Sequence, residues 1–366
     1  MCAGSPGGSS ADFALPGLPL AVVFPPVTGP HEGPGGEWTE SRLDGTAATP
    51  GTAWLPPSAK TPPARPGAPG DSPAGRNAAL DLLRLAAAAV IVFFHAKSPG
   101  AGWMPAAMGL FTALMACLAM AGRDRGSFGG AARRRARRLL RPFAVWAAIY
   151  LGLRLADAAA AHQPLRATAA GWFPPEGTMG PLWFLPFAFA ASLAVVALRR
   201  RMPGIAAPRV ALPLAAAGSA LWLLPLDRSD PDPGIAVFLF YEPALFFGVA
   251  LASAAGSPVW LGLTGAAALG LGLLLGSAGV DGTDQLVLSV PLLAAALAFG
   301  PPGTRATRVA ADLSMAVYLV HVAVLAVMLR TLPLPLGSVE LGAAGFAVSA
   351  LLGLALLRSG LGRLVF

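Results

Sequence analysis

The sequence predicts an all-α integral-membrane protein, a bundle of about ten transmembrane helices preceded by a disordered tail rich in proline and glycine. Of its 366 residues, 55% are hydrophobic and only 12% are charged, and the mean hydropathy is +0.64. A soluble domain of this size carries about 25% charged residues. Long apolar blocks alternate with short charged clusters, as they do in polytopic membrane proteins. The composition therefore excludes the soluble globular class.

Residues 1–75 are expected to form a disordered cytoplasmic tail. They contain 15 prolines and 13 glycines and show no sustained apolar period. Such a segment buries too little apolar surface to offset the entropy lost on ordering. The apolar stretch 13–24 is interrupted by Pro16 and Pro19, and no basic segment precedes it, so it resembles neither a signal peptide nor a span. The membrane domain is accordingly expected over residues 76–366.

Ten apolar segments follow from residue 76 onward, each a candidate transmembrane helix. They cover residues 78–96, 104–122, 142–160, 182–198, 210–226, 235–254, 258–276, 286–300, 309–329 and 338–357. Several are short, and Pro186, Pro213 and Pro291 are expected to break three of them. Breaks of this kind are tolerated only where neighbouring helices or a polar cavity shelter the backbone.

The basic residues predict the topology. Residues 76–366 hold 23 Lys and Arg against 12 Asp and Glu, a net charge of +11. If the first span starts inside, 18 of these basic residues are cytoplasmic and only four, Lys97, Arg166, Arg228 and Arg330, lie opposite. This asymmetry fits the positive-inside rule, so both termini are expected in the cytoplasm of an inner or plasma membrane, and the bilayer, not nucleic acid, is the expected partner. The two cysteines and four scattered histidines indicate no metal site.

The first span carries three polar residues, Asp81, Arg84 and His95. At 100° per residue, the 11 steps from Arg84 to His95 return to within about 20° of one direction, and the 14 steps from Asp81 to within about 40°. One helix face thus holds a cation near the inner surface and an imidazole about 16 Å further along. The alternative is an Asp81–Arg84 ion pair with His95 capping the helix. Because ionisable residues in spans usually face a functional path, we favour a functional stripe.

A second basic cluster, RRRARRLLRP, leads into the third span. A stop-transfer charge block accounts for several of its arginines. The spacing Arg135-x-x-Arg138 also puts two guanidinium groups on one helix face, and guanidinium suits phosphate binding. The overlapping frames Arg134/Arg137 and Arg138/Arg141 leave open which pair would act.

The remaining polar residues of the spans support two interpretations. Glu242, Arg154 and Trp183 are candidates to line an acceptor cavity near His95; equally, Arg154 forms a satisfied ion pair with Asp157, and Trp183 is an interfacial anchor. For Tyr318 and His321, three residues apart in the ninth span, packing and hydrogen bonding within the bundle are favoured.

These segments together resemble acyltransferase family three, the bacterial integral-membrane O-acyltransferases. The matching segments, in family order, are RNAALDLLRLAAAAVIVFFH (76–95), RARRLLRPFAVW (135–146), GPLWFLPF (180–187), FFGVAL (246–251) and LSMAVYLVHVAVL (313–325). The resemblance spans roughly residues 76–357. The second span, MGLFTALMACLAMAG, departs from the Ser-Gly signature usual in the family.

The resemblance implies transfer of an acyl group, commonly acetyl, from acyl-CoA to a hydroxyl of a sugar, glycan or related acceptor. His95 matches the family's essential first-span histidine, Arg84 its first-span arginine, and Arg135 with Arg138 its Arg-x-x-Arg pair. We therefore expect His95 as general base, with Arg84 and Asp81 on the same catalytic face, and Arg135, Arg138 and Arg84 as donor ligands.

Two other classes stay open at this point. A transporter or flippase for a polar or glycolipid substrate would also carry intramembrane charges. Such proteins often contain repeats, and the two halves of five spans show no internal similarity. A structural or assembly protein is the third reading, and it predicts that the first-span charges are dispensable.

Overall fold

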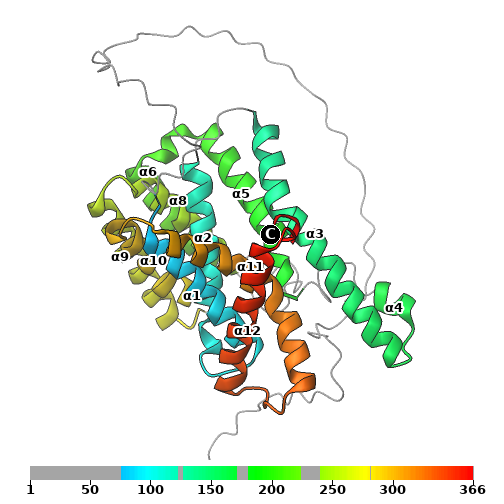
Figure 1. Ribbon diagram of the computed structural model, residues 1–366. Coiled ribbons are helices and arrows are strands. Elements are labelled where there is room, and N and C mark those ends of the chain that lie inside the picture. The colour runs from blue at the N-terminus through cyan, green and yellow to red at the C-terminus, as the bar shows by residue number, and fades with distance from the viewer. Residues whose placement is uncertain (1–75, 123–126, 171–179, 224–239, 281, 366) are drawn as a thin grey trace, which may run out of the picture. The chain divides into compact units, whose positions relative to one another are not determined.

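The computed structural model describes residues 76–122, 127–170, 180–223, 240–280 and 282–365, and every regular element within these ranges is helical (Figure 1). The predicted disordered tail, residues 1–75, lies outside the described residues. The main helices are α1 (Ala78–His95), α2 (Met104–Ala121), α3 (Phe128–Ala160), α5 (Phe184–Arg201), α6 (Pro208–Leu223), α8 (Glu242–Ala254), α9 (Pro258–Ser277), α10 (Val290–Phe299), α11 (Arg305–Thr331) and α12 (Val339–Arg358). Short helices α4 (Leu165–Ala170), η1 (Ala101–Trp103), η2 (Gly180–Trp183), η3 (Pro203–Ala206), η4 (Gln285–Ser289) and α13 (Gly362–Val365) connect or end them.

The all-α membrane fold is confirmed. Within the described residues six helices are long and apolar enough to cross a bilayer: α1, α2 with η1, α3, α9, α11 and α12. The other predicted spans coincide with α5, α6, α8 and η4–α10, which are shorter or, like α5, end in consecutive arginines. A multi-pass membrane protein follows from this set of apolar helices.

Two details of the span prediction were wrong. Neither Pro186 nor Pro213 breaks its helix, because Pro186 is the third residue of α5 and α6 continues through Pro213. Pro291 is the second residue after the π-helical segment η4, so the α-helical hydrogen-bond pattern of this predicted span does change at the proline. Pro142 does lie inside a helix, because α3 begins at Phe128 and not at the predicted residue 142. The basic cluster is therefore part of one 33-residue helix, about 50 Å long, which exceeds the roughly 30 Å apolar core of a bilayer.

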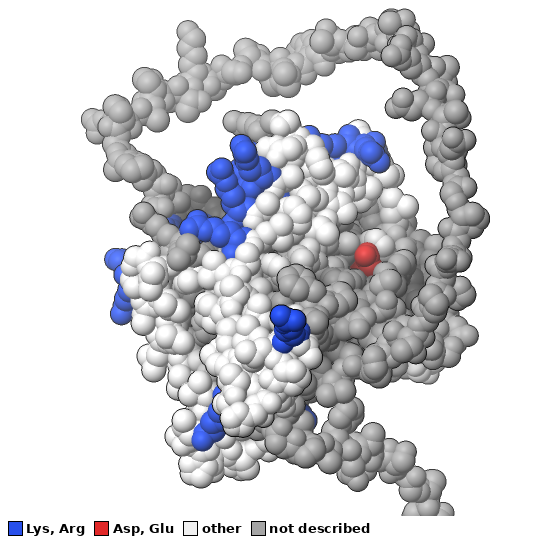
Figure 2. Space-filling view, turned by 90° about the vertical axis from the view of Figure 1, so that its right-hand side faces the viewer, with Lys and Arg blue, Asp and Glu red and all other residues white. Residues whose placement is uncertain are grey.

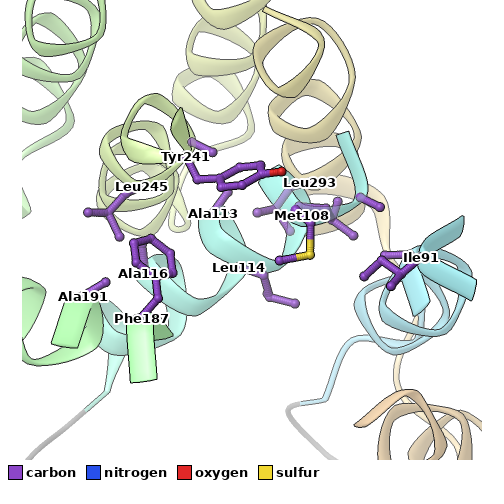
Figure 3. Packing of buried hydrophobic residues seen from close by; sticks show 14 of the residues in the cluster. Ile91, Met108, Ala113, Leu114, Ala116, Phe187, Ala191, Tyr241, Leu245 and Leu293 are labelled. Atoms are coloured by element: carbon purple, nitrogen blue, oxygen red, sulfur yellow. The ribbon is translucent and has the colours of Figure 1, made fainter. Parts of the chain in front are cut away.

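The helices pack through small residues around α2. Gly248 of α8 lies against the backbone of Ala113, and a Cβ at Gly109 would stand 2.6 Å from Cβ of Gln285. Figure 3 shows Ala113 and Ala116 of α2 facing Leu245 and Phe187 from neighbouring helices. Close approach through glycine and alanine is the usual way in which membrane helices associate.

Large apolar side chains also point outward. Phe299 is 82% exposed, Leu221 71% and Val259 70%. On the face shown in Figure 2 most of the described surface is uncharged, and lysine and arginine gather in separate patches. Such a surface is expected where helices contact lipid rather than water.

Helix α1 packs beside α11 and α12. Its start is tied to the segment before α11: the amide of Ala78 donates to the carbonyl of Pro301 at 2.9 Å, and that of Gly303 to the carbonyl of Arg76 at 2.8 Å. Thr304 then opens α11 with a reciprocal capping box. Because α1 and α11 start at the same level and run side by side in the same direction, residues at equal distances from their starts face each other.

Candidate functional site

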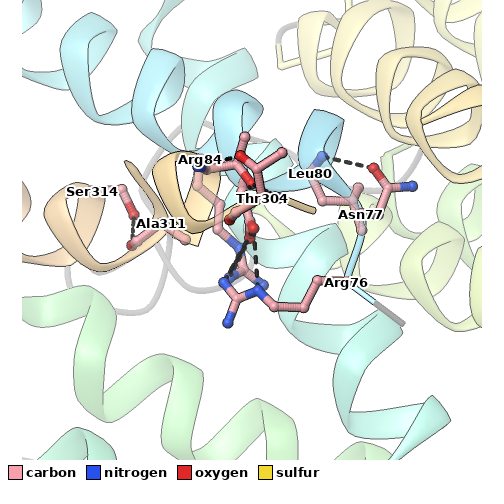
Figure 4. Close-up of polar contacts among 9 residues, drawn as sticks. Arg76, Asn77, Leu80, Arg84, Thr304, Ala311 and Ser314 are labelled. Atoms are coloured by element: carbon pink, nitrogen blue, oxygen red, sulfur yellow. Dashed lines mark hydrogen bonds and ion pairs between the residues drawn. The ribbon is translucent and has the colours of Figure 1, made fainter. Parts of the chain in front are cut away.

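The start of α1 holds a buried carboxylate between two arginines. Asn77 caps the helix, its side chain accepting from the amide of Leu80 at 3.2 Å (Figure 4). Asp81 is 4% exposed and accepts from Arg76, with Nη2 at 3.1 Å from both carboxylate oxygens. Nη1 of Arg84 lies 3.9 Å from the same carboxylate. The predicted Asp81–Arg84 pair therefore exists, but Arg76 is the closer partner of Asp81.

Arg84 of α1 is close enough to charges on two other helices to interact with them electrostatically. Its side chain is 21% exposed, and the charges of Arg138 on α3 and Asp312 on α11 act on its guanidinium. Arg76, Arg84 and Arg138 thus form a basic group at one end of the bundle, with Asp81 and Asp312 as its acidic counterparts. A group of several guanidinium forks with partial neutralisation is suited to bind phosphate.

The helical register of α3 places one of its clustered arginines on the face that meets the bundle. Trp146 and Tyr150 are buried and fix the face of α3 that meets the bundle: Nε1 of Trp146 donates to the carbonyl of Val365 at 3.1 Å, and the hydroxyl of Tyr150 to that of Leu319 at 2.7 Å. Arg135 precedes Trp146 by 11 residues, which returns to within about 20° of the same direction. Arg135 is half-buried, whereas Arg134, Arg137 and Arg138 are all exposed, so the register singles out Arg135 alone.

His95 occupies the last turn of α1, where the helix ends in a Schellman motif. The amide of Ser98 donates to the carbonyl of Phe93 and that of Lys97 to the carbonyl of Phe94, both at 2.9 Å, with Lys97 in the left-handed region at φ 54°. The hydroxyl of Ser98 donates to the carbonyl of Ser338, which ties this end to the loop before α12. The imidazole of His95 is therefore held on a fixed backbone.

A second histidine faces His95. The ring of His321, fully buried on α11, has its centroid 5.0 Å from that of His95, with 46° between the ring planes. Nδ1 of His321 lies 2.8 Å from the carbonyl of Tyr318 and 3.2 Å from that of Val317. Because carbonyl oxygens only accept, we assign the hydrogen of neutral His321 to Nδ1. Its Nε2 then carries a lone pair, and that atom has no hydrogen-bond partner within the described residues.

Aromatic rings surround this pair of histidines. Tyr318 is buried next to His321, with ring centroids 6.2 Å apart, and its hydroxyl also lacks a partner in the described part of the chain. Phe111 of α2 and Phe184 of α5 pack against Tyr318 at 6.4 and 6.2 Å. Two buried polar atoms thus lie next to an imidazole, in an apolar shell, without a hydrogen-bond partner among the described residues.

The family comparison fits this arrangement. The sequence model of acyltransferase family 3, described as an acyltransferase domain, matches residues 77–358, which is most of the chain and all of the helices α1 to α12. The chain belongs to acyltransferase family 3. No curated protein and no solved structure matches it. The resemblance predicted from the sequence is confirmed, and the protein is a membrane acyltransferase.

The three residues proposed for the acceptor cavity lie on three different elements of the acyltransferase. Trp183, at the end of η2, contacts Phe184 at 5.9 Å and stacks on Tyr241 at 5.9 Å with 21° between the planes. Glu242, half-buried, is the next residue after Tyr241 and starts α8. Arg154 lies in the last two turns of α3.

Asp157 has a partner on another helix that its position in the sequence does not indicate. One of its carboxylate oxygens is 2.7 Å from Nη2 of Arg330, near the end of α11. This pair joins the ends of α3 and α11 that lie opposite to the arginine group of Arg76, Arg84 and Arg138.

Sequence reasoning missed the roles of His321 and Asp312. The spacing of Tyr318 and His321 predicts packing and hydrogen bonding within the bundle. This prediction accounts for the hydrogen bond of Nδ1 of His321 but not for its unpartnered Nε2. Nothing in the period of either helix says that residue 321 lies against residue 95. The available signal was that basic residues stand at the starts of both segments, Arg76 and Arg84 in one and Arg305 and Arg308 in the other, which predicts the same direction for the two helices.

Proposed function

We propose that this acyltransferase moves an acyl group, typically acetyl, from acyl-CoA to a hydroxyl of a sugar, glycan or related acceptor, with His95 as general base. The observation that carries the proposal is the division of the α1–α11 interface into a guanidinium group at the helix starts and an imidazole pair further along. Arg84 and His95 are about 16 Å apart along α1. This separation suits a donor that is long and anionic at one end and reactive at the other.

The donor is proposed to bind from the cytoplasmic side. The phosphates of CoA contact Arg135 and Arg138, with Arg84 next along the path, and the pantetheine arm follows α1 toward His95. Arg135 on the bundle-facing side of α3 and the electrostatic coupling of Arg138 to Arg84 support this frame over Arg134/Arg137. Both termini are then cytoplasmic, and the membrane is the inner or plasma membrane.

The transfer needs no covalent enzyme intermediate in this proposal. A lone pair of His95 takes the proton of the acceptor hydroxyl as the oxygen attacks the thioester carbonyl carbon. The new C–O bond forms, the C–S bond breaks, and the proton held by His95 passes to the leaving sulfur to give the CoA thiol. Imidazole is suited to both steps because it titrates near neutrality. Asp81, paired with Arg76, fixes Arg84 rather than contacting the acceptor.

The first experiment measures thermal unfolding of the purified full chain in detergent with and without acetyl-CoA. A ligand at a hundred times its dissociation constant stabilises the folded state by about 2.7 kcal/mol. We expect this stabilisation in the wild type and in His95→Ala, and its loss when Arg135→Ala and Arg138→Ala are combined. The matched control combines Arg133→Ala with Arg137→Ala, which removes the same charge from two exposed positions of the same helix.

The outcomes separate the function classes. A shift lost in the Arg135/Arg138 variant and kept in the Arg133/Arg137 variant supports the donor path. Equal loss in both variants contradicts the proposed frame and indicates general electrostatic attraction. If neither acetyl-CoA nor longer acyl-CoA stabilises a folded wild type, the protein has no acyl-CoA donor, and a transporter or flippase becomes the better reading.

A further inference from the structure

The proposed chemistry does not use the buried ring nitrogen Nε2 of His321. Its Nδ1–H is used by the carbonyl of Tyr318, and its Nε2 is buried without a partner among the described residues. A buried acceptor left unpaired lowers the stability of a protein, so it calls for an explanation. The imidazole of His95 lies beside it, with the centroids of the two rings 5.0 Å apart.

The separation of the two rings permits a direct bond. Ring nitrogens lie on the perimeter of each imidazole, so centroids 5.0 Å apart are compatible with an N–H···N distance of about 3 Å after rotation of the half-buried His95 side chain. Only the side chain of His95 has to rotate. The backbone at His95 is fixed by the Schellman motif, and the ring of His321 is fixed by its bond to Tyr318. Phe94 packs edge-on against His95 at 5.2 Å and limits the ring's other orientations.

We infer that His321 is a positioning residue that sets the tautomer of His95. Its Nε2 accepts the N–H of one His95 nitrogen, so that the other nitrogen presents a lone pair to the acceptor hydroxyl. When His95 takes the hydroxyl proton, the same acceptor stabilises the imidazolium until the proton leaves with the CoA sulfur. This inference rests on the proposed function of His95 and adds the residue that orients it.

Two substitutions separate the two nitrogens of His321. Asn places its amide as many bonds from Cβ as Nδ1, so His321→Asn retains a donor to the Tyr318 carbonyl and removes the group that reaches His95. Gln places its amide as many bonds from Cβ as Nε2, so His321→Gln retains an acceptor toward His95 and gives up the Nδ1 bond. A purely structural role and a positioning role thus predict opposite orders for the two variants.

The experiment uses bromoacetyl-CoA as the probe, on the full chain in detergent micelles. The lone pair of a base near the thioester displaces bromide from the CH₂ carbon, a C–N bond forms, and peptide mass spectrometry identifies the alkylated residue. The reaction needs no acceptor. The dependence of its rate on reagent concentration gives the maximal rate and the half-saturating concentration separately. Excess CoA should protect the residue.

We expect alkylation of His95 in the wild type and a maximal rate at least about tenfold lower in His321→Asn, with an unchanged half-saturating concentration. His321→Gln should recover most of this loss. The inference is overturned if His321→Asn reacts like the wild type, or if Gln is the slower of the two. Should His321→Asn not fold, His321→Gln decides alone: a rate close to the wild type supports positioning, and a tenfold loss contradicts it.

The same experiment distinguishes failure of the inference from failure of the proposed function. If the folded wild type is not alkylated at His95, the donor does not reach this residue, and the proposed function fails together with the inference. If His95 reacts in the wild type and both variants at position 321 match it, only the role of His321 is lost.

Discussion

Gly248 offers the sharpest test of how the bundle is held together. A Cβ added there would overlap the carbonyl oxygen of Ala113 and lie 2.8 Å from both the Cα of Ala113 and the Cβ of Ala116. Ordinary carbon contacts begin at about 3.4 Å, so α2 and α8 would have to separate by at least 0.6 Å. Gaps of about 0.5–1 Å forfeit a quarter to a half of each dispersion contact. We therefore expect Gly248→Ala to lower the free energy of unfolding by about 1–3 kcal/mol, the usual cost of overpacking.

The matched control is Gly262→Ala on α9. Gly262 is exposed and nothing lies within 4 Å of the Cβ that would be added, so stability should stay the same or rise slightly through the higher helix propensity of alanine. Both variants are compared by thermal unfolding in the same detergent, followed by tryptophan fluorescence. Equal stability of the two alanine variants would refute the close approach of α2 and α8.

The same measurement checks two polar contacts. Asp81→Asn should lower the free energy of unfolding by about 1–2 kcal/mol, because it leaves Arg76 and Arg84 without their shared carboxylate. The loss stays moderate because Arg76 is partly in water. An unchanged free energy of unfolding would show that this carboxylate is no structural partner. Tyr150→Phe should cost about 1 kcal/mol through loss of its bond to α11, whereas Tyr318→Phe, whose hydroxyl has no partner in the described residues, should cost less, and the reverse order would contradict the assignment.

Much of the fold follows from the sequence because bilayer helices are specified locally. Length, hydropathy and flanking charges located the segments, and the 3.6-residue period put Asp81, Arg84 and His95 on one face of α1. The third span was predicted to start at residue 142 because the arginines before it are not apolar, whereas α3 already begins at Phe128. In a helix that extends beyond the bilayer, charge marks the depth at which lipid begins and not the point at which the helix ends.

The site was harder to predict than the spans. The first-span residues and the Arg135/Arg138 pair came from local spacing, whereas the contact of His95 with His321 depends on which helices are neighbours. A hydrophobic period shows which face of a helix is buried, but it does not show which other helix packs against that face. Arg76 was overlooked as the partner of Asp81 for a related reason: it lies before the helix, where helical spacing does not apply.

The pairing of α1 with α11 has a consequence for biosynthesis. His95 and His321 are 226 positions apart, so at about 5–20 residues per second the partner of the first helix emerges from the ribosome roughly 10–45 s later. During that interval α1 resides in the lipid with a carboxylate on its apolar surface. Arg76, only five positions before Asp81, is synthesised with it and supplies a counter-charge at once. The local ion pair thus neutralises the charge of Asp81 while α1 is already in the bilayer and α11, which completes its interface, has not yet been synthesised.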